Sequence, residues 1–510
     1  MSILTRSLWS MLSQTNGPVV YDGDDLYNTK KLATDVSDLS DQVREMGIGN
    51  ETKVVLALPN SYAFTVAYIA LLLTGAVVVP VNPTLPATEM ERFMSRFEAK
   101  AVLMQDDAES GWADIFARTG LHPLGTAAEL SLPGTALWLR VSASSEQAPE
   151  LRTPDEDAPA VLMFTSGTTG NPKGVLLRHR HVMAAALHVV ESHALTQEDV
   201  SYCILPLFHI NAQVIVLLST LLSGGTLVMA DRFHASRFWQ DVAKHQVTWV
   251  SCVPTILSIL TKRDVLEGST ASLRFVRSAS APLSPAILAR FESQVGVPVI
   301  ESYGMTEAAG QICVNPLPPG LRKTGSVGKP YGIDLKVVDD EGRAVAAFDV
   351  GEIAIRGANV IEGYWNVGEE PGSATEQGWI HTGDLGYVDN DGYVFITGRR
   401  KEIINRAGEK LSPREIEDTL NGHIDVASSA VIGLPDPLYG ERVVAWVVPT
   451  DFDGTDATQL KRELQALCLR SLAKHKCPSE FIVARSVPVG PTGKVQKHLL
   501  RDKVAAARLA

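Results

Sequence analysis

Short apolar runs alternate with longer stretches of helical spacing through the N-terminal part of the chain. Runs of strand length, rich in Val, Ile and Leu, occur at residues 53–59, 101–105, 161–165, 225–230, 249–254 and 273–280. Helical patterns lie between them, for example at residues 236–244 and 284–294. Strands that alternate with helices favour an α/β architecture with largely parallel sheets.

One apolar stretch, residues 62–81, is about long enough to cross a bilayer. Gly75 and Pro80 interrupt it. We therefore predict a buried helix at 62–73 that ends at Gly75, followed by a buried strand at 76–79. No other stretch resembles a membrane span, so we expect no integral membrane association.

The pattern changes twice further along the chain. Strand character with turn residues dominates residues 325–397, and helices with short strands return after residue 398. We therefore predict an α/β fold with two domains. Residues 1–398 form a large N-terminal domain of mixed and parallel sheets flanked by helices, with a β-rich subdomain. Residues 399–510 form a small, mobile α+β domain.

Composition and charge narrow the class of protein. The chain has 510 residues, 45% hydrophobic and 20% charged, as in ordinary soluble globular proteins. A net charge of −12 argues against a nucleic-acid binder with a broad basic face. The five cysteines are scattered without CxxC spacing, and the N-terminus lacks a secretory pattern. We therefore expect reduced thiols and a cytoplasmic location; an oligomer is possible.

The densest motif is the loop FTSGTTGNPKG at residues 164–174, which follows an apolar strand. Small residues allow backbone N–H groups to approach a ligand, and hydroxyl groups with Lys173 suit a polyphosphate. The loop is not a Walker A motif, because Pro172 precedes the lysine and Gly174 follows it. By composition alone, a phosphate-binding loop and a plain connector remain equally open.

Further motifs follow in a fixed order: ESYGMTE at 301–307, YWN at 364–366, GWIHTGDLG at 378–386, ITGRRKEIINRAGEKLSP at 396–413 and PTGKVQK at 491–497. The set resembles the adenylate-forming superfamily, which includes acyl- and aryl-CoA synthetases, firefly luciferase and the adenylation domains of peptide synthetases. The resemblance covers residues 54–497. It implies that a carboxylic acid reacts with ATP to form an acyl-adenylate, and that a thiol then expels AMP. The implied cofactors are ATP, Mg²⁺ and coenzyme A.

The resemblance assigns roles residue by residue. Lys494 would bridge the acid and the α-phosphate, Thr306 would contact that phosphate, Tyr303 would stack on adenine, and Asp384 and Arg399 would hold the ribose and phosphate. Lys401 would be the hinge of the mobile domain, and Gly408 would lie beside the thioester site. The phosphate loop would comprise Thr165, Ser166, Gly167, Thr168, Thr169, Gly170 and Lys173, with Glu307 and Thr165 as metal ligands. Taken singly, Lys494 or Glu307 could be a solvated surface charge, Tyr303 packed core, and Asp384 or Arg399 half of a surface ion pair. The match of the whole motifs favours the functional interpretation.

The acyl pocket is expected from the same resemblance. Its residues would be His209, Ser280, Ala281, Ser302, Gly304, Gly310 and Gln311, with His209 also a catalytic candidate. Phe208 and His209 stand where amino-acid-activating domains place an Asp, which favours a plain carboxylic acid. A packed, non-catalytic His209 carries equal weight.

Two stretches, SASAPLSP at 278–285 and CVNPLPPG at 313–320, resemble the oxalate–CoA ligase branch. That branch carries a His where this chain has Gly310. Replacement of this His by Gly310 is expected to open the pocket floor and to favour a small to medium aliphatic or aromatic monocarboxylate. An oxalate- or malonate-type dicarboxylate is the alternative. The histidines at 179, 181, 188 and 193 are expected on a helix surface rather than around a metal.

Coenzyme A is the expected acceptor, because no carrier domain follows Lys497. A stand-alone enzyme that loads a carrier protein is the alternative. A luciferase-like oxygenase has no positive sign in the sequence. A binding protein with a degenerate site is disfavoured, because Lys173, Glu307, Asp384, Arg399 and Lys494 are all present.

Overall fold

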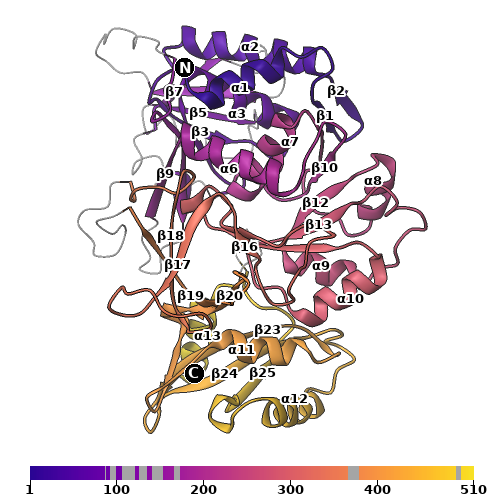
Figure 1. Cartoon of the computed structure of the whole chain (residues 1–510), viewed down its shortest axis with the longest axis vertical. Helices are drawn as coiled ribbons and strands as arrows, with labels where there is room; N and C mark the ends of the chain where they lie inside the picture. Colours follow the sequence, from indigo (N-terminus) through magenta and orange to yellow (C-terminus); the bar gives the residue numbers. More distant parts are fainter. Residues whose placement is uncertain are drawn as a thin grey trace.

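The computed structural model describes residues 1–86, 88–91, 99–105, 121–125, 135–140, 153–165, 173–365, 378–489 and 495–509. Figure 1 shows the large N-terminal part above and the C-terminal sheet with its helices below. The predicted α/β class is confirmed, with strands and helices alternating along the chain.

The first large sheet has seven strands in the order β6-β7-β5-β3-β4-β8-β9. Its strands are β3 (Lys53–Ala57), β4 (Val77–Pro80), β5 (Ala101–Gln105), β6 (Leu121–Gly125), β7 (Thr135–Arg140), β8 (Pro159–Thr165) and β9 (Lys173–Arg178). The central strands β5, β3, β4 and β8 run parallel, whereas β9 returns antiparallel to β8. The strands predicted at 53–59, 101–105 and 161–165 are therefore confirmed.

The second large sheet has nine strands in the order β16-β15-β14-β13-β12-β10-β11-β1-β2. They are β1 (Val19–Asp22), β2 (Asp25–Tyr27), β10 (Val200–Cys203), β11 (Thr226–Met229), β12 (Trp249–Cys252), β13 (Phe275–Ser278), β14 (Val299–Tyr303), β15 (Cys313–Val314) and β16 (Lys329–Pro330). Neighbouring strands from β1 to β14 are parallel, so their carboxyl ends meet at one edge. In open parallel sheets this edge is the usual place for a ligand.

Helices cover both large sheets. They are α1 (Ile3–Leu12), α2 (Thr29–Glu45), α3 (Tyr62–Thr74), α6 (His179–Ser192), the π-helix η2 (Asn211–Leu218), α7 (Ser219–Leu222), α8 (Phe238–Lys244), α9 (Pro254–Leu260) and α10 (Pro285–Val295). Helix α3 is the predicted buried helix, and Gly75 ends it with φ = 78°. In the part of the chain that the structure describes, no helix is long and apolar enough to span a membrane.

Two further sheets occur in the part of the chain that the structure describes. A four-stranded antiparallel sheet contains β17 (Ile333–Val338), β18 (Gly351–Gly357), β19 (Ile380–Val388) and β20 (Val394–Arg399). The last sheet contains β21 (Ile404–Arg406), β22 (Glu409–Leu411), β23 (Val426–Asp436), β24 (Gly440–Pro449) and β25 (Glu480–Val483), packed with α11 (Pro413–Asn421), α12 (Ala457–Ser471) and α13 (Lys497–Leu509). This last sheet has its own hydrophobic clusters. The predicted boundary after residue 398 falls where β20 ends.

The expectation for the histidines of α6 was wrong in one respect. His179, His181 and His193 are fully buried rather than on a helix surface. His179 Nδ1 lies 3.1 Å from Ser2 Oγ, and His181 Nδ1 accepts from the Arg178 backbone N–H at 3.1 Å. Burial lowers the pKa of both rings to about 4, so they are neutral polar members of the core.

Asn60 connects the two large sheets. It lies between β3 and α3, is 8% exposed, and donates to the carbonyls of Leu205 at 2.9 Å and Ala230 at 3.1 Å. Its Oδ1 accepts from the Leu207 backbone N–H at 2.7 Å. These contacts fix the loop after β10 that leads to His209.

Replacing Asn60 should therefore destabilise the N-terminal part. Asn60→Ala removes hydrogen bonds to three backbone groups, of which the Leu205 carbonyl keeps a contact from the Cys203 thiol, and this should cost roughly 2–4 kcal/mol. Thermal unfolding followed by circular dichroism measures the loss, with Asn16→Ala as the control because Asn16 is exposed. Equal unfolding midpoints for the two variants would contradict this account.

Candidate active site

Three side chains from separate strands meet at the carboxyl end of β14. Tyr303 Oη donates to Asp384 Oδ2 at 2.6 Å, and Arg399 Nε lies 2.9 Å from Asp384 Oδ1. Asp384 is buried, and in the β19–β20 ladder it is the direct partner of Arg399. Burial and the neighbouring carboxylate together raise the pKa of Tyr303 far above its usual value. The sequence motifs at 303, 384 and 399 are thus brought into contact.

Glu307 lies one turn further on, in the short helix η3 (Thr306–Ala308) that begins with Thr306. It is 5% exposed, and it accepts a hydrogen bond from Tyr364 Oη at 2.8 Å. The Ile361 backbone N–H donates to the Glu307 carbonyl at 2.9 Å. Asn359, also buried, donates to the carbonyls of Ala308 and Gln311 at 2.8 and 2.9 Å. The segment after β18 therefore fixes the turn that contains Glu307 through these hydrogen bonds.

Burial is the largest influence on the Glu307 carboxyl, and it raises the pKa of that group. The hydrogen bond from Tyr364 acts in the opposite direction and lowers it. Burial also raises the pKa of Tyr364 itself. Tyr364 therefore stays a proton donor, and it favours the ionised form of a carboxylate that the surrounding protein disfavours.

Lys173 connects this group to the glycine-threonine loop. Its Nζ lies 4.9 Å from the centroid of the Tyr364 ring. Thr165 and Lys173, which flank the loop in the sequence, are paired across the antiparallel β8–β9 ladder. The loop residues Ser166, Gly167, Thr168, Thr169 and Gly170 lie outside the described residues, as does the side chain of Thr165. Lys173 thus contacts the same Tyr364 whose hydroxyl donates to Glu307.

The predicted pocket residues lie around the same sheet edge. Gly304 and Gly310 approach closely, because a Cβ on Gly304 would lie 2.0 Å from the Gly310 carbonyl oxygen. Gly310 itself has φ = 110°, which glycine adopts most readily. The expectation that Gly310 opens the pocket floor was wrong. A Cβ there would lie 2.9 Å from Ile215 Cδ1, so Ile215 of η2 already fills that space.

His209 lies just before η2. Its Nε2 is buried and has no hydrogen-bond partner among the described residues. Burial lowers the pKa of the ring to about 4, so it is neutral near pH 7. Phe208 packs beside it with ring centroids 4.4 Å apart. A neutral, packed imidazole agrees with the non-catalytic alternative as well as with a pocket role.

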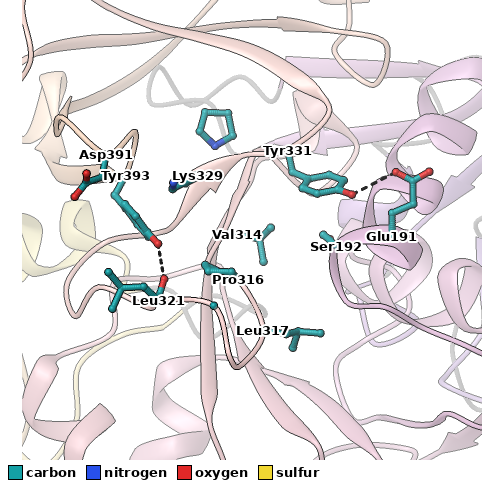
Figure 2. A pocket seen from close by; sticks show the side chains of 12 residues that line it. Glu191, Ser192, Val314, Pro316, Leu317, Leu321, Lys329, Tyr331, Asp391 and Tyr393 are labelled. Carbon is teal, nitrogen blue, oxygen red and sulfur yellow. Dashed lines mark hydrogen bonds between the residues drawn. The ribbon is translucent and has the colours of Figure 1, made fainter.

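The remaining pocket residues divide between exposed and buried positions. Ser280 is exposed and Ala281 is half-buried, directly after β13. Ser302 and Gln311 are buried, and Gln311 Nε2 donates to Ser192 Oγ at 3.1 Å. Figure 2 shows that Ser192 also lines a separate cleft beside Tyr331 and Leu317. Tyr303, Glu307, Asp384 and Arg399 do not line this cleft.

The residues around Lys401 are tied to different parts of the molecule. Arg400 forms ion pairs with Asp340 at 2.6 Å and Glu352 at 2.8 Å, both in the segments around β17 and β18. Glu402 instead pairs with Lys497 of α13 at 3.0 Å. Lys401 therefore lies between two residues, Arg400 and Glu402, whose ion pairs attach them to different parts of the molecule.

The two remaining predicted residues are not joined to this group. Gly408 lies in the exposed turn between β21 and β22, where its N–H donates to Asn405 Oδ1 at 3.1 Å. Lys494 lies outside the described residues. The roles predicted for both stay predictions.

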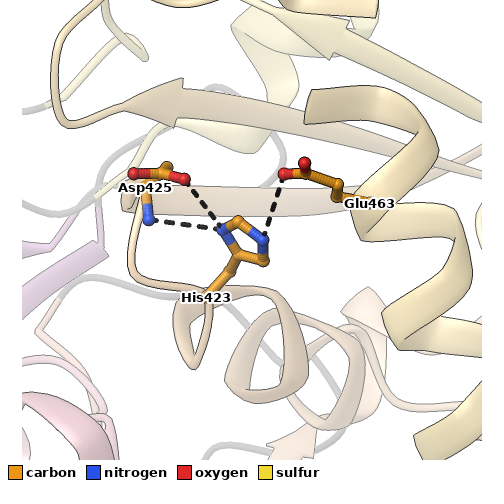
Figure 3. A group of neighbouring side chains, drawn as sticks. All are labelled: His423, Asp425 and Glu463. Carbon is orange, nitrogen blue, oxygen red and sulfur yellow. Dashed lines mark hydrogen bonds and ion pairs between the residues drawn. The ribbon is translucent and has the colours of Figure 1, made fainter. Parts of the chain in front are cut away.

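A possible cation site occurs in the C-terminal part. Figure 3 shows His423 between Asp425 and Glu463, with Nδ1–Oδ2 and Nε2–Oε2 distances of 3.9 and 3.6 Å. All three could offer a ligand atom. They lie on α12 and beside α11, apart from the Glu307 group, and ordinary ion pairing accounts for their arrangement.

Sequence reasoning missed several residues of the site. Tyr364 lies in the YWN motif, for which the sequence predicted no role, and Asn359 belongs to none of the motifs. Arg277, a buried guanidinium on β13, was also missed. An isolated arginine in an apolar strand pattern was the available signal, because charged residues are rarely fully buried.

Comparison with known proteins agrees with this geometry. Residues 11–365 match the family model described as "AMP-binding enzyme", and residues 415–494 match "AMP-binding enzyme C-terminal domain". A sulfoacetate–CoA ligase of Cupriavidus necator is 39% identical, covering 91% of this chain and 90% of the relative. An oxalate–CoA ligase of Arabidopsis thaliana is 37% identical, covering 90% and 89%.

Solved structures agree over the whole chain. ATP-bound MatB from Rhodopseudomonas palustris superposes with a TM-score of 0.86 at 28% identity, covering 98% of each chain. The o-succinylbenzoate CoA synthetase MenE of Bacillus subtilis, in complex with its acyl-adenylate intermediate, has a TM-score of 0.81 at 27% identity, covering 98% and 97%. The chain therefore belongs to the AMP-binding enzyme family, as an AMP-forming acid–CoA ligase.

Proposed function

We propose that this enzyme activates a small carboxylic acid at the carboxyl end of β14. The residues described above bind the nucleotide, the metal ion and the acid in the roles given below. The proposal rests on two groups of side chains that lie together at this edge of the sheet. One group is Tyr303, Asp384 and Arg399, and the other is Glu307, Tyr364 and Lys173.

The reaction has two steps. In the first, an oxygen of the acid attacks the α-phosphorus of ATP, and pyrophosphate leaves. In the second, the sulfur of coenzyme A attacks the activated carbonyl, the thiol proton is lost, and AMP leaves with the oxygen that came from the acid. Both the acid and ATP are anionic, so the first step requires positive charge and oriented donors around the phosphates.

Asp384 and Tyr303 are suited to the nucleoside. A buried carboxylate accepts strong hydrogen bonds, which fits the two ribose hydroxyl groups. Arg399 forms an ion pair with Asp384 at 2.9 Å. The Tyr303 ring remains half-buried at the strand end and offers an aromatic face to the adenine.

Glu307 fits a magnesium site. Mg²⁺ prefers hard oxygen ligands and is commonly held by one or two carboxylates together with substrate phosphates. When bound, Mg²⁺ neutralises charge on the phosphates. Glu307 supplies a buried carboxylate whose ionised form Tyr364 supports, and Thr165 is the second proposed ligand. Thr306 contacts the α-phosphate.

Lys173 and the loop that precedes it hold the β- and γ-phosphates, and Lys494 bridges the acid and the α-phosphate. Lys401 is the hinge about which residues 399–510 rotate relative to residues 1–398. The opposed ion pairs of Arg400 and Glu402 support this position for the hinge. Gly408 then faces the thiol in the second step.

A panel of acids tests the activity. Oxalate, malonate, sulfoacetate, short and medium fatty acids, benzoate and cinnamate are each incubated with ATP, Mg²⁺ and coenzyme A, and AMP is measured. Lys494→Ala should lose about 100- to 1,000-fold in rate. Lys503→Ala is the control, because Lys503 is exposed on α13.

Each outcome has a distinct meaning. Acid-dependent AMP release that Lys494→Ala loses supports the proposal. Acid-dependent exchange of pyrophosphate into ATP without release by coenzyme A would instead favour a carrier protein as the acceptor. An unchanged rate in Lys494→Ala would contradict the role of that lysine.

A second prediction concerns the pH dependence. Tyr364→Phe removes the hydrogen bond that lowers the pKa of Glu307, so that pKa rises and the carboxylate is protonated at a higher pH. The acidic limb of kcat/KM for MgATP should therefore move to higher pH. Tyr387→Phe is the control, because that ring stacks on Phe395 in the four-stranded sheet. An unshifted limb in Tyr364→Phe would exclude Glu307 as the group that titrates.

A further inference from the structure

Arg277 is a buried charge for which the described part of the chain supplies no countercharge. It lies on β13 with 0% of its surface exposed. Its Nη1 donates to Ser251 Oγ at 3.3 Å and to Asn211 Oδ1 at 3.5 Å. Within the described residues, Nε and Nη2 have no hydrogen-bond partner, and no carboxylate pairs with the guanidinium.

Such an arrangement is unfavourable for folding. A guanidinium in the interior loses its hydration, and usually a carboxylate compensates for that loss. Burial lowers the pKa of Arg277 to about 9, so the side chain still carries its charge near neutral pH. A positive charge that the described residues leave unbalanced is a candidate for balance by a ligand.

Asn211 links the Arg277 guanidinium to the predicted acyl pocket through hydrogen bonds. Arginine can only donate, so the Asn211 oxygen must face it, and Ser251 Oγ donates to the same oxygen at 3.0 Å. The amide nitrogen is thereby directed the other way, where it donates to Ser280 Oγ at 3.4 Å. Unlike Arg277, Asn211 and Ser280 reach the surface.

Two backbone features mark the same place. Asn211 is the first residue of η2, and π-helical turns are rare and frequent at functional sites. Ser280 has φ = 73°, a conformation that non-glycine residues adopt at a cost and that clusters at ligand sites. The backbone thus holds the Ser280 hydroxyl beside the amide of Asn211.

The position relative to the ATP-site residues is also suitable. Ser280 follows β13, and Tyr303 ends β14, the neighbouring parallel strand. Both therefore lie at the same edge of the nine-stranded sheet, and His209 precedes Asn211 by two residues. An acid whose carboxylate reacts near Tyr303 and Glu307 can extend its other end toward Asn211.

We infer that the Asn211 amide and the Ser280 hydroxyl bind a second, negatively charged group of the acid, and that the buried charge of Arg277 behind Asn211 makes this an anion receptor. The ligand class is a short carboxylic acid with a carboxylate or sulfonate at its far end. Arg277 is a positioning residue, since it acts through Asn211. The inference rests on the proposed function and replaces the neutral monocarboxylate as the preferred substrate class.

Matched acids of similar shape test the inference. The pairs are oxalate with isobutyrate, malonate with isovalerate, and sulfoacetate with 3,3-dimethylbutyrate, so each pair differs mainly in charge at the far end. Acid-dependent exchange of pyrophosphate into ATP measures activation alone. Calorimetric titration of each acid, in the presence of a nonhydrolysable ATP analogue, measures binding without turnover.

The wild type should favour the charged member of at least one pair. Arg277→Met, which keeps the length and removes the charge, should lower kcat/KM for that acid by at least about 100-fold, mainly through KM. Its neutral partner should change little, and Arg277→Lys should recover part of the selectivity. The unfolding midpoint of Arg277→Met should not fall, because an unbalanced buried charge is removed.

Arg274→Met is the matched control on the same segment. Arg274 pairs with Asp199 at 2.5 Å, so its loss should lower stability but leave the selectivity ratio unchanged. The inference is overturned if no charged acid binds in the titration, or if Arg277→Met keeps the ratio of the wild type. Failure of the proposed function looks different: charged acids bind, but none supports exchange.

Discussion

The buried carboxylate of Asp384 is the constraint on which the geometry of the site depends. A carboxylate in this position must be hydrogen-bonded and neutralised, and Tyr303 and Arg399 do both. Tyr303 belongs to the nine-stranded sheet, whereas Asp384 and Arg399 belong to the four-stranded one. The requirement to satisfy one buried charge therefore fixes the β-rich segment against the edge where the parallel strands end.

The same edge collects the other polar groups for a topological reason. Parallel strands end together, so the residues after β13 and β14 become neighbours although they are far apart in sequence. Asn359 and Tyr364, which follow β18, fix the turn that contains Glu307 by hydrogen bonds. The apolar sheets thus hold a small set of polar and charged side chains at one edge, where Asp384 is paired with Arg399 and Glu307 accepts from Tyr364.

Much of the fold could be predicted from local patterns. The apolar stretch that contains Gly75 resolved into a helix, a left-handed cap and a strand, because a cap and a buried strand have clear local signals. The motif residues Tyr303, Asp384 and Arg399 could be grouped only through resemblance to a family. No periodicity predicts that side chains 81 residues apart, such as Tyr303 and Asp384, share a hydrogen bond.

The errors have physical causes. Gly310 suggested an open floor, but Ile215 of η2 fills the space, and the packing of a distant helix cannot be deduced from one glycine. His179 and His181 looked like surface residues because histidine is polar, yet a neutral imidazole with one partner is tolerated in a core. Arg277 was missed because it lies within a short strand run and its hydrogen-bond partners lie on other elements.

The most direct test of the central claim follows the oxygen atoms. The acid that turns over fastest is labelled with ¹⁸O in its reacting carboxylate, and the products formed with ATP and coenzyme A are analysed by mass spectrometry. An acyl-adenylate requires that one labelled oxygen appear in AMP and none in pyrophosphate. Unlabelled AMP, with the label in a phosphate product instead, would contradict activation at the α-phosphorus.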